Sequence, residues 1–267
     1  MMKVSLLSIL RSTQLLIHGL PMLCVLLLCI TKPLSAQEYH GTSGLLHTPS
    51  AEMRPVGTFS GGAAFLDSEV MPHMVGWNRN RPFNAPAYTL GVTLFSWLEM
   101  SYTGVLGKIR QDDGTYKYTN EDRHFNVKAR LLKEGKWWPA IALGIDDFGH
   151  DFSFGIKDDK SWTGNNNFEC HYAVASKHVS FNWLTLGAHL AFRTYPEKHN
   201  GDRKGWAGGI TLAPTALPHS RLIAEWDGKG VNVGGDILLW RHLFLQAALV
   251  HGKGLMAVAA YQYTIPF

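Results

Sequence analysis

Cysteine is scarce in this sequence, with three residues among 267. Cys24 and Cys29 lie in the first 36 residues, which have the features of a cleaved export signal, so Cys170 is the one thiol expected in the mature chain. A single thiol excludes a disulfide framework, even in an oxidising compartment. It also excludes a Cys-x-x-Cys redox or zinc motif. We expect Cys170 to act as a small apolar residue that faces outward.

The common catalytic and cofactor motifs are also missing. The sequence contains no His-Glu-x-x-His, no Gly-x-Ser-x-Gly and no phosphate-binding loop. Asp112, Asp113 and Gly114 lack the spacing of an EF-hand, so a solvated acidic turn is the interpretation. We therefore expect no catalytic residue, no metal, no cofactor and no enzymatic activity.

Long apolar stretches are confined to the N-terminus. Residues 15–30 are mostly apolar, follow the positive charges of Lys3 and Arg11, and precede a small-residue site that ends at Ala36. This pattern predicts a secretory signal peptide over residues 1–36. A permanent membrane helix is the alternative, but the run is short for a span. Removing the segment takes away almost all of the formal net charge of +4, so the mature chain has no basic excess for nucleic-acid binding.

The remaining sequence alternates with a period of two residues and shows little helical periodicity. At its end, Tyr261, Tyr263, Ile265 and Phe267 share one face of a predicted strand. An alternating strand that closes on an aromatic residue is typical of the membrane-assembly signal of bacterial outer-membrane β-barrels, and a strand end tolerates Pro266. A chain that crosses a membrane without apolar helices must form a closed barrel.

We therefore predict an all-β fold, a transmembrane antiparallel up-and-down β-barrel of about 12 strands that occupies residues 56–267. The strands have the length of about ten residues that a tilted membrane strand needs. They are expected over residues 56–66, 86–96, 97–107, 123–132, 137–147, 167–178, 182–193, 205–213, 220–227, 231–240, 242–250 and 254–267.

Long and short links alternate between these strands. The long, polar links are expected over residues 67–85, 108–122, 148–166 and 194–204, whereas the intervening links are short. Long loops at one end and short turns at the other are typical of outer-membrane barrels. Tryptophans support this, because Trp97, Trp137, Trp138, Trp183 and Trp240 adjoin the short turns, and Trp206 and Trp226 lie at the opposite strand ends. We expect two aromatic girdles at the membrane interfaces.

If the apolar faces contact lipid, a set of polar side chains points into the barrel. These are Lys128, Arg130, Asp146, Glu169, His171, His189, Arg193, Glu225 and Asp236. Two interpretations stay open. The charges could pair and hold the barrel in shape, because unpaired buried charge is costly. They could instead line a polar passage or cavity for a hydroxyl-rich ligand such as a sugar.

Two further expectations concern the interior. The lead-in segment, residues 37–55, precedes the first strand and could fold inward as a plug. The alternation also places Ser176 toward lipid, on the other side of the wall from His171 and His189. That placement argues against a nucleophile and its base, which must lie within hydrogen-bond reach of each other.

Several segments resemble the YjbH family of exopolysaccharide-associated outer-membrane proteins. Gly44-Leu45-Leu46-His47-Thr48-Pro49 is similar to the opening Gly-Leu-Leu-x-Thr-Pro motif of that family. The most specific match is the block 128–135, followed by residues 139–144 and 147–149, and further similarity covers residues 172–177, 225–228 and 232–234. The resemblance implies an outer-membrane barrel, in a Gram-negative bacterium, that is linked to making or exporting an extracellular polysaccharide. It supplies no catalytic residues.

The leading hypothesis is a non-enzymatic barrel that assists export or surface assembly of a polysaccharide, by a polar lumen or as a structural component. One alternative is an outer-membrane enzyme that acts on lipid or glycan. Another is a structural or adhesion barrel that acts through its long outer loops. The expected partners are outer-membrane lipid, polysaccharide, the barrel-assembly machinery and periplasmic polysaccharide-export proteins.

Overall fold

The computed structural model describes residues 37–72, 83–148, 167–195, 203–217 and 219–266. The predicted signal peptide, residues 1–36, lies outside this part of the chain. Within it, no helix is long and apolar enough to cross a membrane.

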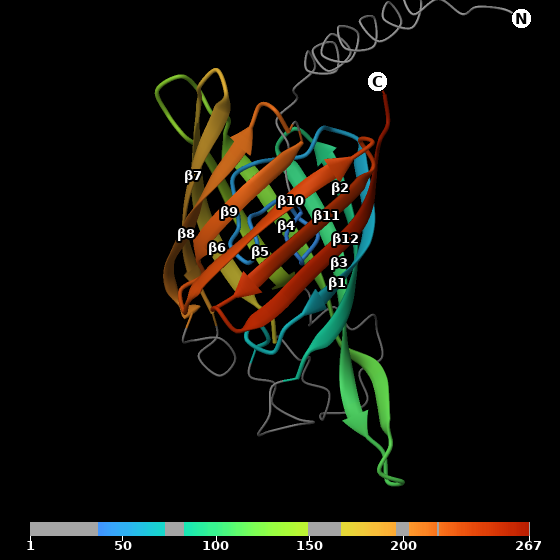
Figure 1. Cartoon of the computed structure of the whole chain (residues 1–267). Helices are drawn as coiled ribbons and strands as arrows, with labels where there is room; N and C mark the ends of the chain where they lie inside the picture. Colours follow the sequence, from blue (N-terminus) through green and yellow to red (C-terminus); the bar gives the residue numbers. More distant parts are fainter. Residues whose placement is uncertain (1–36, 73–82, 149–166, 196–202, 218, 267) are drawn as a thin grey trace, which may run out of the picture. The chain divides into compact units, whose positions relative to one another are not determined.

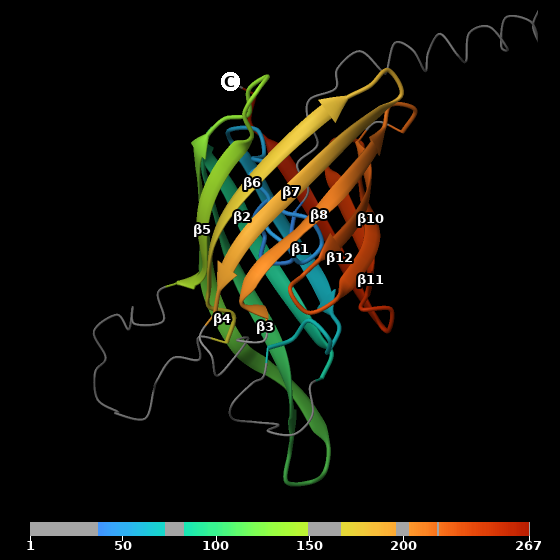
Figure 2. The same ribbon diagram turned by 90° about the vertical axis from the view of Figure 1, so that its left-hand side faces the viewer.

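Twelve antiparallel strands form one closed barrel, which confirms the predicted fold (Figures 1 and 2). Each strand pairs with its neighbours in sequence, and β1 closes the barrel against β12. The strands are β1 (Thr58–Leu66), β2 (Ala85–Phe95), β3 (Leu98–Arg110), β4 (Tyr116–Leu132), β5 (Ala140–Phe148), β6 (Cys170–Ser180), β7 (Leu184–Thr194), β8 (Gly205–Pro214), β9 (Ser220–Trp226), β10 (Val231–Leu239), β11 (Leu243–Val250) and β12 (Gly254–Thr264).

The predicted loop over residues 108–122 is wrong, because β3 and β4 continue through it as a hairpin. Arg110 pairs with Tyr116, and the connection is a tight turn closed by a hydrogen bond from the Gln111 amide to the Thr115 carbonyl (2.8 Å). Gly114 has a φ of 82°, which a residue with a side chain rarely adopts. The hairpin extends beyond the rest of the barrel (Figures 1 and 2). The Asp-Asp-Gly sequence was therefore correctly interpreted as a turn, but the residues around it were not.

The exterior of the barrel is apolar and ends in aromatic residues. Along β12, exposed and buried residues alternate strictly from Gly254 to Gln262, as period-two strands require. At the end with the short links, the indole rings of Trp137 and Trp240 are 81% and 79% exposed. Trp206 and Trp226, at the other strand ends, are also exposed. Exposed apolar side chains between two aromatic bands are what lipid contact requires.

The interior has an apolar sector and a polar sector. Ile223, Phe244 and Met256 project inward from β9, β11 and β12, and they pack with Leu45 and Leu46 in one buried cluster. Most other inward side chains are polar. The segment of the chain that lies inside the barrel must therefore supply hydrogen-bond partners for them.

Candidate functional site

The candidate site is the interior of the barrel, where residues 37–55, called here the inner segment, lie against the wall. It is drawn in blue inside the strands in Figures 1 and 2. Residues 37–51 are all buried, and two isolated antiparallel bridges fold the segment on itself. Gly41 has a φ of 86°, and a Cβ there would lie 2.9 Å from the Cβ of Ser101. The segment therefore needs glycine at this close approach to β3.

Glu99, on β3, is the first of three anchors for the inner segment. Its buried carboxylate accepts hydrogen bonds from the Ser43 amide (2.9 Å) and the Arg54 amide (2.6 Å). The Nζ of Lys128 lies 3.2 Å from the same carboxylate. Lys128 also donates to the carbonyls of Ser43 and Glu52, both at 2.7 Å. One ion pair of the wall thus holds the backbone of the inner segment at Ser43 and again at Glu52 and Arg54.

The second anchor lies near the end of β9 that faces the long loops. Glu225 accepts hydrogen bonds from the amides of Leu46 (3.1 Å) and His47 (2.8 Å). Arg193, on β7, donates to the carbonyl of His47 (3.1 Å) and to that of Asp227. Burial holds the pKa of His47 at about 4, although Asp227 opposes this effect, so the imidazole is neutral at pH 7.

The third anchor joins Glu52 to β6 and β9. Arg221, on β9, donates to Glu52 (2.8 Å), to Asp236 on β10 (2.9 Å) and to the carbonyl of Gly44 (3.1 Å). His178, on β6, lies 3.1 Å from the other oxygen of Glu52. Burial alone raises the pKa of Glu52, but Arg221 and His178 outweigh burial and hold it well below its ordinary value. Glu52 is therefore a carboxylate that the wall stabilises in its charged form.

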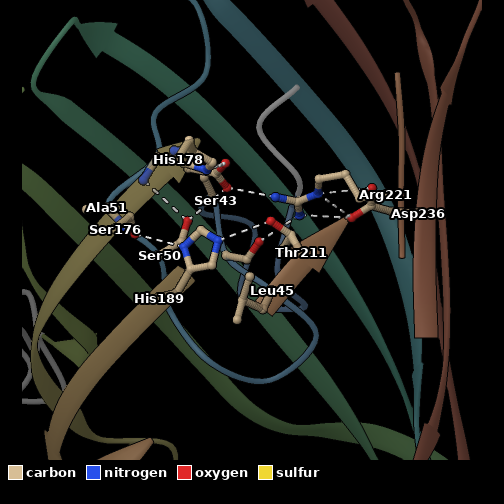
Figure 3. Close-up of polar contacts among 12 residues, drawn as sticks. Ser43, Leu45, Ser50, Ala51, Ser176, His178, His189, Thr211, Arg221 and Asp236 are labelled. Atoms are coloured by element: carbon tan, nitrogen blue, oxygen red, sulfur yellow. Dashed lines mark hydrogen bonds and ion pairs between the residues drawn. The ribbon is translucent and has the colours of Figure 1, made fainter. Parts of the chain in front are cut away.

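Ser176 and His189 form a hydrogen-bonded pair on the inner face of the wall, which corrects the expectation that Ser176 faces lipid. The Ser176 hydroxyl lies 2.9 Å from Nδ1 of His189 and accepts a hydrogen bond from the Ala51 amide (2.8 Å; Figure 3). Both side chains are buried beneath the inner segment. In this arrangement the hydroxyl secures the segment and is covered from any substrate. The expectation of a non-enzymatic protein stays a prediction.

The structure places most of the predicted lumen residues inside the barrel. Those that are buried on the inner face are Lys128, Asp146, His189, Arg193, Glu225 and Asp236. Arg130 lies at the end with the short links, where it donates to the carbonyl of Ser96 (2.6 Å) and is partly exposed. Three of these residues, Lys128, Arg193 and Glu225, contact the backbone of the inner segment directly.

The expectation that Glu169 and His171 face the lumen is wrong. His171 is exposed on the outer face and lies 3.3 Å from Glu169, which immediately precedes β6. The inward residues of β6 are Cys170, Tyr172, Val174 and Ser176, so the prediction that Cys170 faces outward is also wrong. Tyr172 pairs with Gly144 of β5, and its ring occupies the space where a Cβ would stand. The glycine on the neighbouring strand therefore accommodates the large ring inside the barrel.

The residues predicted as the membrane-assembly signal lie on the outer face where they are described. Tyr261, Tyr263 and Ile265 are all exposed. Phe267 lies outside the described residues.

Sequence reasoning missed Glu99 and Arg221, which are the most connected charged residues of the wall. Both lie on inward positions of strands that were predicted within a few residues, so a strict count of alternate positions along residues 97–107 and 220–227 would have found them. It also missed Glu38, His40, His47 and Glu52, because the inner segment has no periodic pattern to show which of its side chains meet the wall.

Three groups of residues bring potential metal ligands within 4.8 Å of one another in the described part of the chain. They are Glu52 with His178 and His189, Glu38 with His40 and Asp146, and Asp122 with His124 and Asp147. In the first group the carboxylate is already engaged by Arg221, and both histidines have protein partners. In the second group, by contrast, one carboxylate oxygen of Glu38 and one of Asp146 have no hydrogen-bond partner.

A closed strand wall, an apolar exterior with aromatic bands, and an interior occupied by the same chain define a membrane-associated β-barrel protein. The chain belongs to the YjbH family, because the model of that family, described as "Exopolysaccharide biosynthesis protein YbjH", matches residues 36–193. It is 31% identical over 162 residues to "Uncharacterized lipoprotein YjbH" of Escherichia coli (strain K12). That match covers 57% of this chain and 18% of the relative, so the chain spans only a small part of the relative's length.

Three of the solved structures that the chain resembles are outer-membrane proteins of low sequence identity. One is an outer membrane channel from Pseudomonas putida F1, with a TM-score of 0.38 and 13% identity, covering 80% of this chain and 98% of that one. Another is the Salmonella typhi outer membrane phospholipase dimer with bound calcium, with a TM-score of 0.35, 11% identity, and coverage of 78% and 90%. A third is outer membrane phospholipase A from Escherichia coli, with a TM-score of 0.33, 10% identity, and coverage of 80% and 98%.

Proposed function

We propose that this protein is an outer-membrane β-barrel of a Gram-negative bacterium that assists export or surface assembly of an extracellular polysaccharide. Family membership supports the polysaccharide context, since the family is described by exopolysaccharide biosynthesis. The outward row of apolar side chains, closed by exposed tryptophans, supports the membrane location. The end with the short links, where Thr58 of β1 meets Thr264 of β12, would face the periplasm.

The inner segment makes the resting barrel closed. Lys128, Arg193 and Glu225, the groups best suited to bind a sugar, are occupied by backbone groups of this segment. A polysaccharide that crosses the lumen must therefore displace the inner segment. Once displaced, the segment leaves behind donors and acceptors on a polar wall, which is the chemistry that hydroxyl groups require.

The proposal is tested by deleting the gene and measuring secreted polysaccharide, with complementation by wild-type protein. Barrel folding and location are followed by heat-dependent gel migration of the outer-membrane fraction. Undiminished secretion in the deletion strain would refute the polysaccharide role. Recovery of the protein in the soluble fraction would refute the location.

A disulfide lock separates passage from a structural role. The Ala51 amide donates to the Ser176 hydroxyl at 2.8 Å, so the two residues are neighbours, and a cysteine is placed at each of them in a Cys170→Ala background to test for a disulfide between the inner segment and β6. We expect the oxidised lock to stop secretion and a reducing agent to restore it. The two single-cysteine variants are the matched controls. Normal secretion by the fully locked barrel would refute passage through the lumen and leave a structural role.

A further inference from the structure

The cluster of Glu38, His40 and Asp146 contains buried carboxylate oxygens that lack a hydrogen-bond partner. Glu38 and His40 belong to the inner segment, Asp146 belongs to β5, and all three are buried. One potential ligand atom from each lies within 4.8 Å of the other two. Glu38 Oε2 and Asp146 Oδ1 are buried and have no hydrogen-bond partner. A buried carboxylate oxygen without a partner is costly, so this arrangement needs a proton, a water molecule or a cation.

The cluster lines a small enclosed cavity of about 10 Å³, which is close to the space that one water-sized atom occupies. The other residues that line the cavity are Tyr39, His47, Pro49, Phe168, Cys170, Arg193 and Tyr195. Arg193 directs hydrogen bonds to the carbonyls of His47 and Asp227. The room inside the cluster therefore fits a single ion or water and no organic ligand.

A second shell orients His40 as a metal ligand requires. Its Nδ1 lies 3.3 Å from Nε2 of His124, and Nδ1 of His124 lies 3.0 Å from a carboxylate oxygen of Asp122. When Asp122 accepts a hydrogen bond from Nδ1–H of His124, and Nε2 of His124 accepts one from Nδ1–H of His40, Nε2 of His40 keeps its lone pair. A chain of this kind, running from a carboxylate to a ligating histidine, is the usual support of a metal ligand.

We propose that Glu38, His40 and Asp146 bind one divalent transition-metal ion, Zn²⁺ or Mn²⁺, which ties the inner segment to β5. One imidazole and two carboxylates suit these ions, whereas Mg²⁺ and Ca²⁺ prefer oxygen alone. Two anionic ligands balance the charge of the ion, and the ion coordinates the two carboxylate oxygens that lack a hydrogen-bond partner. The cluster around Glu52, which contains two histidines, needs no metal ion, because the guanidinium of Arg221 already balances the charge of its carboxylate.

The test uses the mature protein purified in detergent, stripped with a chelator, and titrated with Zn²⁺ and separately with Mn²⁺. Metal content is measured after dialysis, and heat-dependent gel migration verifies the barrel. We expect one equivalent of metal in the wild type and its loss in Asp146→Asn, a substitution that keeps the shape of the side chain. His124→Gln removes the supporting contact and should lower affinity by about 10- to 100-fold. His171→Gln, at a histidine that is exposed on the outer face, is the matched control and should bind as the wild type does.

Stoichiometric binding that depends on Asp146 and His124 but not on His171 would establish the site. Failure of the wild type to bind either ion, or equal binding by Asp146→Asn, would overturn it and leave a water molecule or a shared proton in the cavity. If Asp146→Asn does not fold, His124→Gln and the electron paramagnetic resonance spectrum of Mn²⁺ in the wild type decide. A spectrum identical to that of Mn²⁺ in buffer would then reject the proposal. None of these measurements depends on polysaccharide export.

Discussion

Substituting Glu99 by glutamine probes how firmly the inner segment is held. The side chain keeps its shape, but its negative charge is lost from a fully buried position. Lys128 Nζ at 3.2 Å and Arg54 Nε at 3.6 Å then lose the anion that balances them. The amide group also offers one acceptor oxygen where the carboxylate offered two. The amides of Ser43 and Arg54 must therefore compete for that single oxygen.

The size of the effect follows from the cost of an uncompensated buried charge. Removing one partner of a buried ion pair costs about 3–5 kcal/mol. Arg54 and Ser43 belong to the inner segment, whereas Lys128 belongs to the wall, so displacement of the segment exposes the unbalanced cations to water and recovers much of that cost. At the lower bound of about 3 kcal/mol, the displaced population rises by roughly 100-fold.

Thiol labelling measures that population. Ser50 is fully buried in the inner segment, so a cysteine at this position, in a Cys170→Ala background, reacts with a maleimide only when the segment is displaced. When closing is faster than labelling, the labelling rate follows the equilibrium population of the open form. We therefore expect Glu99→Gln to label about 100-fold faster than its parent, with unchanged heat-dependent gel migration.

The matched control is Glu169→Gln, the same substitution at a carboxylate on the outer face next to His171. It should label at the parental rate. Equal labelling rates for Glu99→Gln and the parent, in a barrel that is still folded, would refute the role of this ion pair in retaining the inner segment.

Three further outcomes are expected. Acidification below pH 4.5, the ordinary pKa of a glutamate, should increase the labelling rate of the inner segment relative to that of a free thiol at the same pH. Although Glu52 is buried, Arg221 holds its pKa below that value, so the stabilisation of the docked segment by charged Glu52 is present above pH 4.5 and is lost as pH falls. A relative rate that does not change with pH would contradict this. Ser176→Ala should leave secretion unchanged while destabilising the docked segment by about 1–3 kcal/mol in the labelling assay, and abolished secretion by a folded variant would instead indicate catalysis. Leu190→Arg, at an outer position that is 54% exposed, should lower stability in lipid vesicles by about 2–4 kcal/mol in a urea titration, and unchanged stability would argue against lipid contact.

The barrel could be predicted because the membrane restricts what a chain without apolar helices can form. Most strand ends lie within three residues of their predicted positions. The exception is the start of β4, at Tyr116. Residues 116–122 extend past the membrane-sized part of the strand, where lipid no longer imposes an apolar outer face. A polar strand in that position has the composition of a loop, so composition alone could not identify it.

The orientation of β6 was wrong because neither of its faces is uniformly apolar. One face carries His171 with two alanines, and the other carries Cys170, Tyr172 and Ser176. The preference for Tyr172 inside depends on Gly144 of β5, which supplies the space for its ring. That information lies on another strand, in a register that a single strand does not specify.

The contacts of the inner segment were beyond prediction for a related reason. Glu225 and Lys128 were expected inside the barrel, but their partners are amides and carbonyls of residues 43–52. Backbone groups are present at every position and leave no signature in the sequence. Side-chain alternation therefore predicted the strands of the wall, whereas the position of the inner segment in the lumen could be learned only from the structure.

The three anchors also limit how the proposed passage could open. The first and third anchors each contain a buried ion pair, Lys128 with Glu99 and Arg221 with Glu52, and breaking one such pair costs about 3–5 kcal/mol. Spontaneous displacement of the whole segment is therefore rare. Moving a two-state equilibrium from 1:99 to 99:1 requires a ligand that prefers the open state by about 10⁴-fold, or about 5.5 kcal/mol. An export partner that opens this barrel must accordingly bind the displaced segment or the vacated wall, because binding the closed and open forms equally would shift nothing.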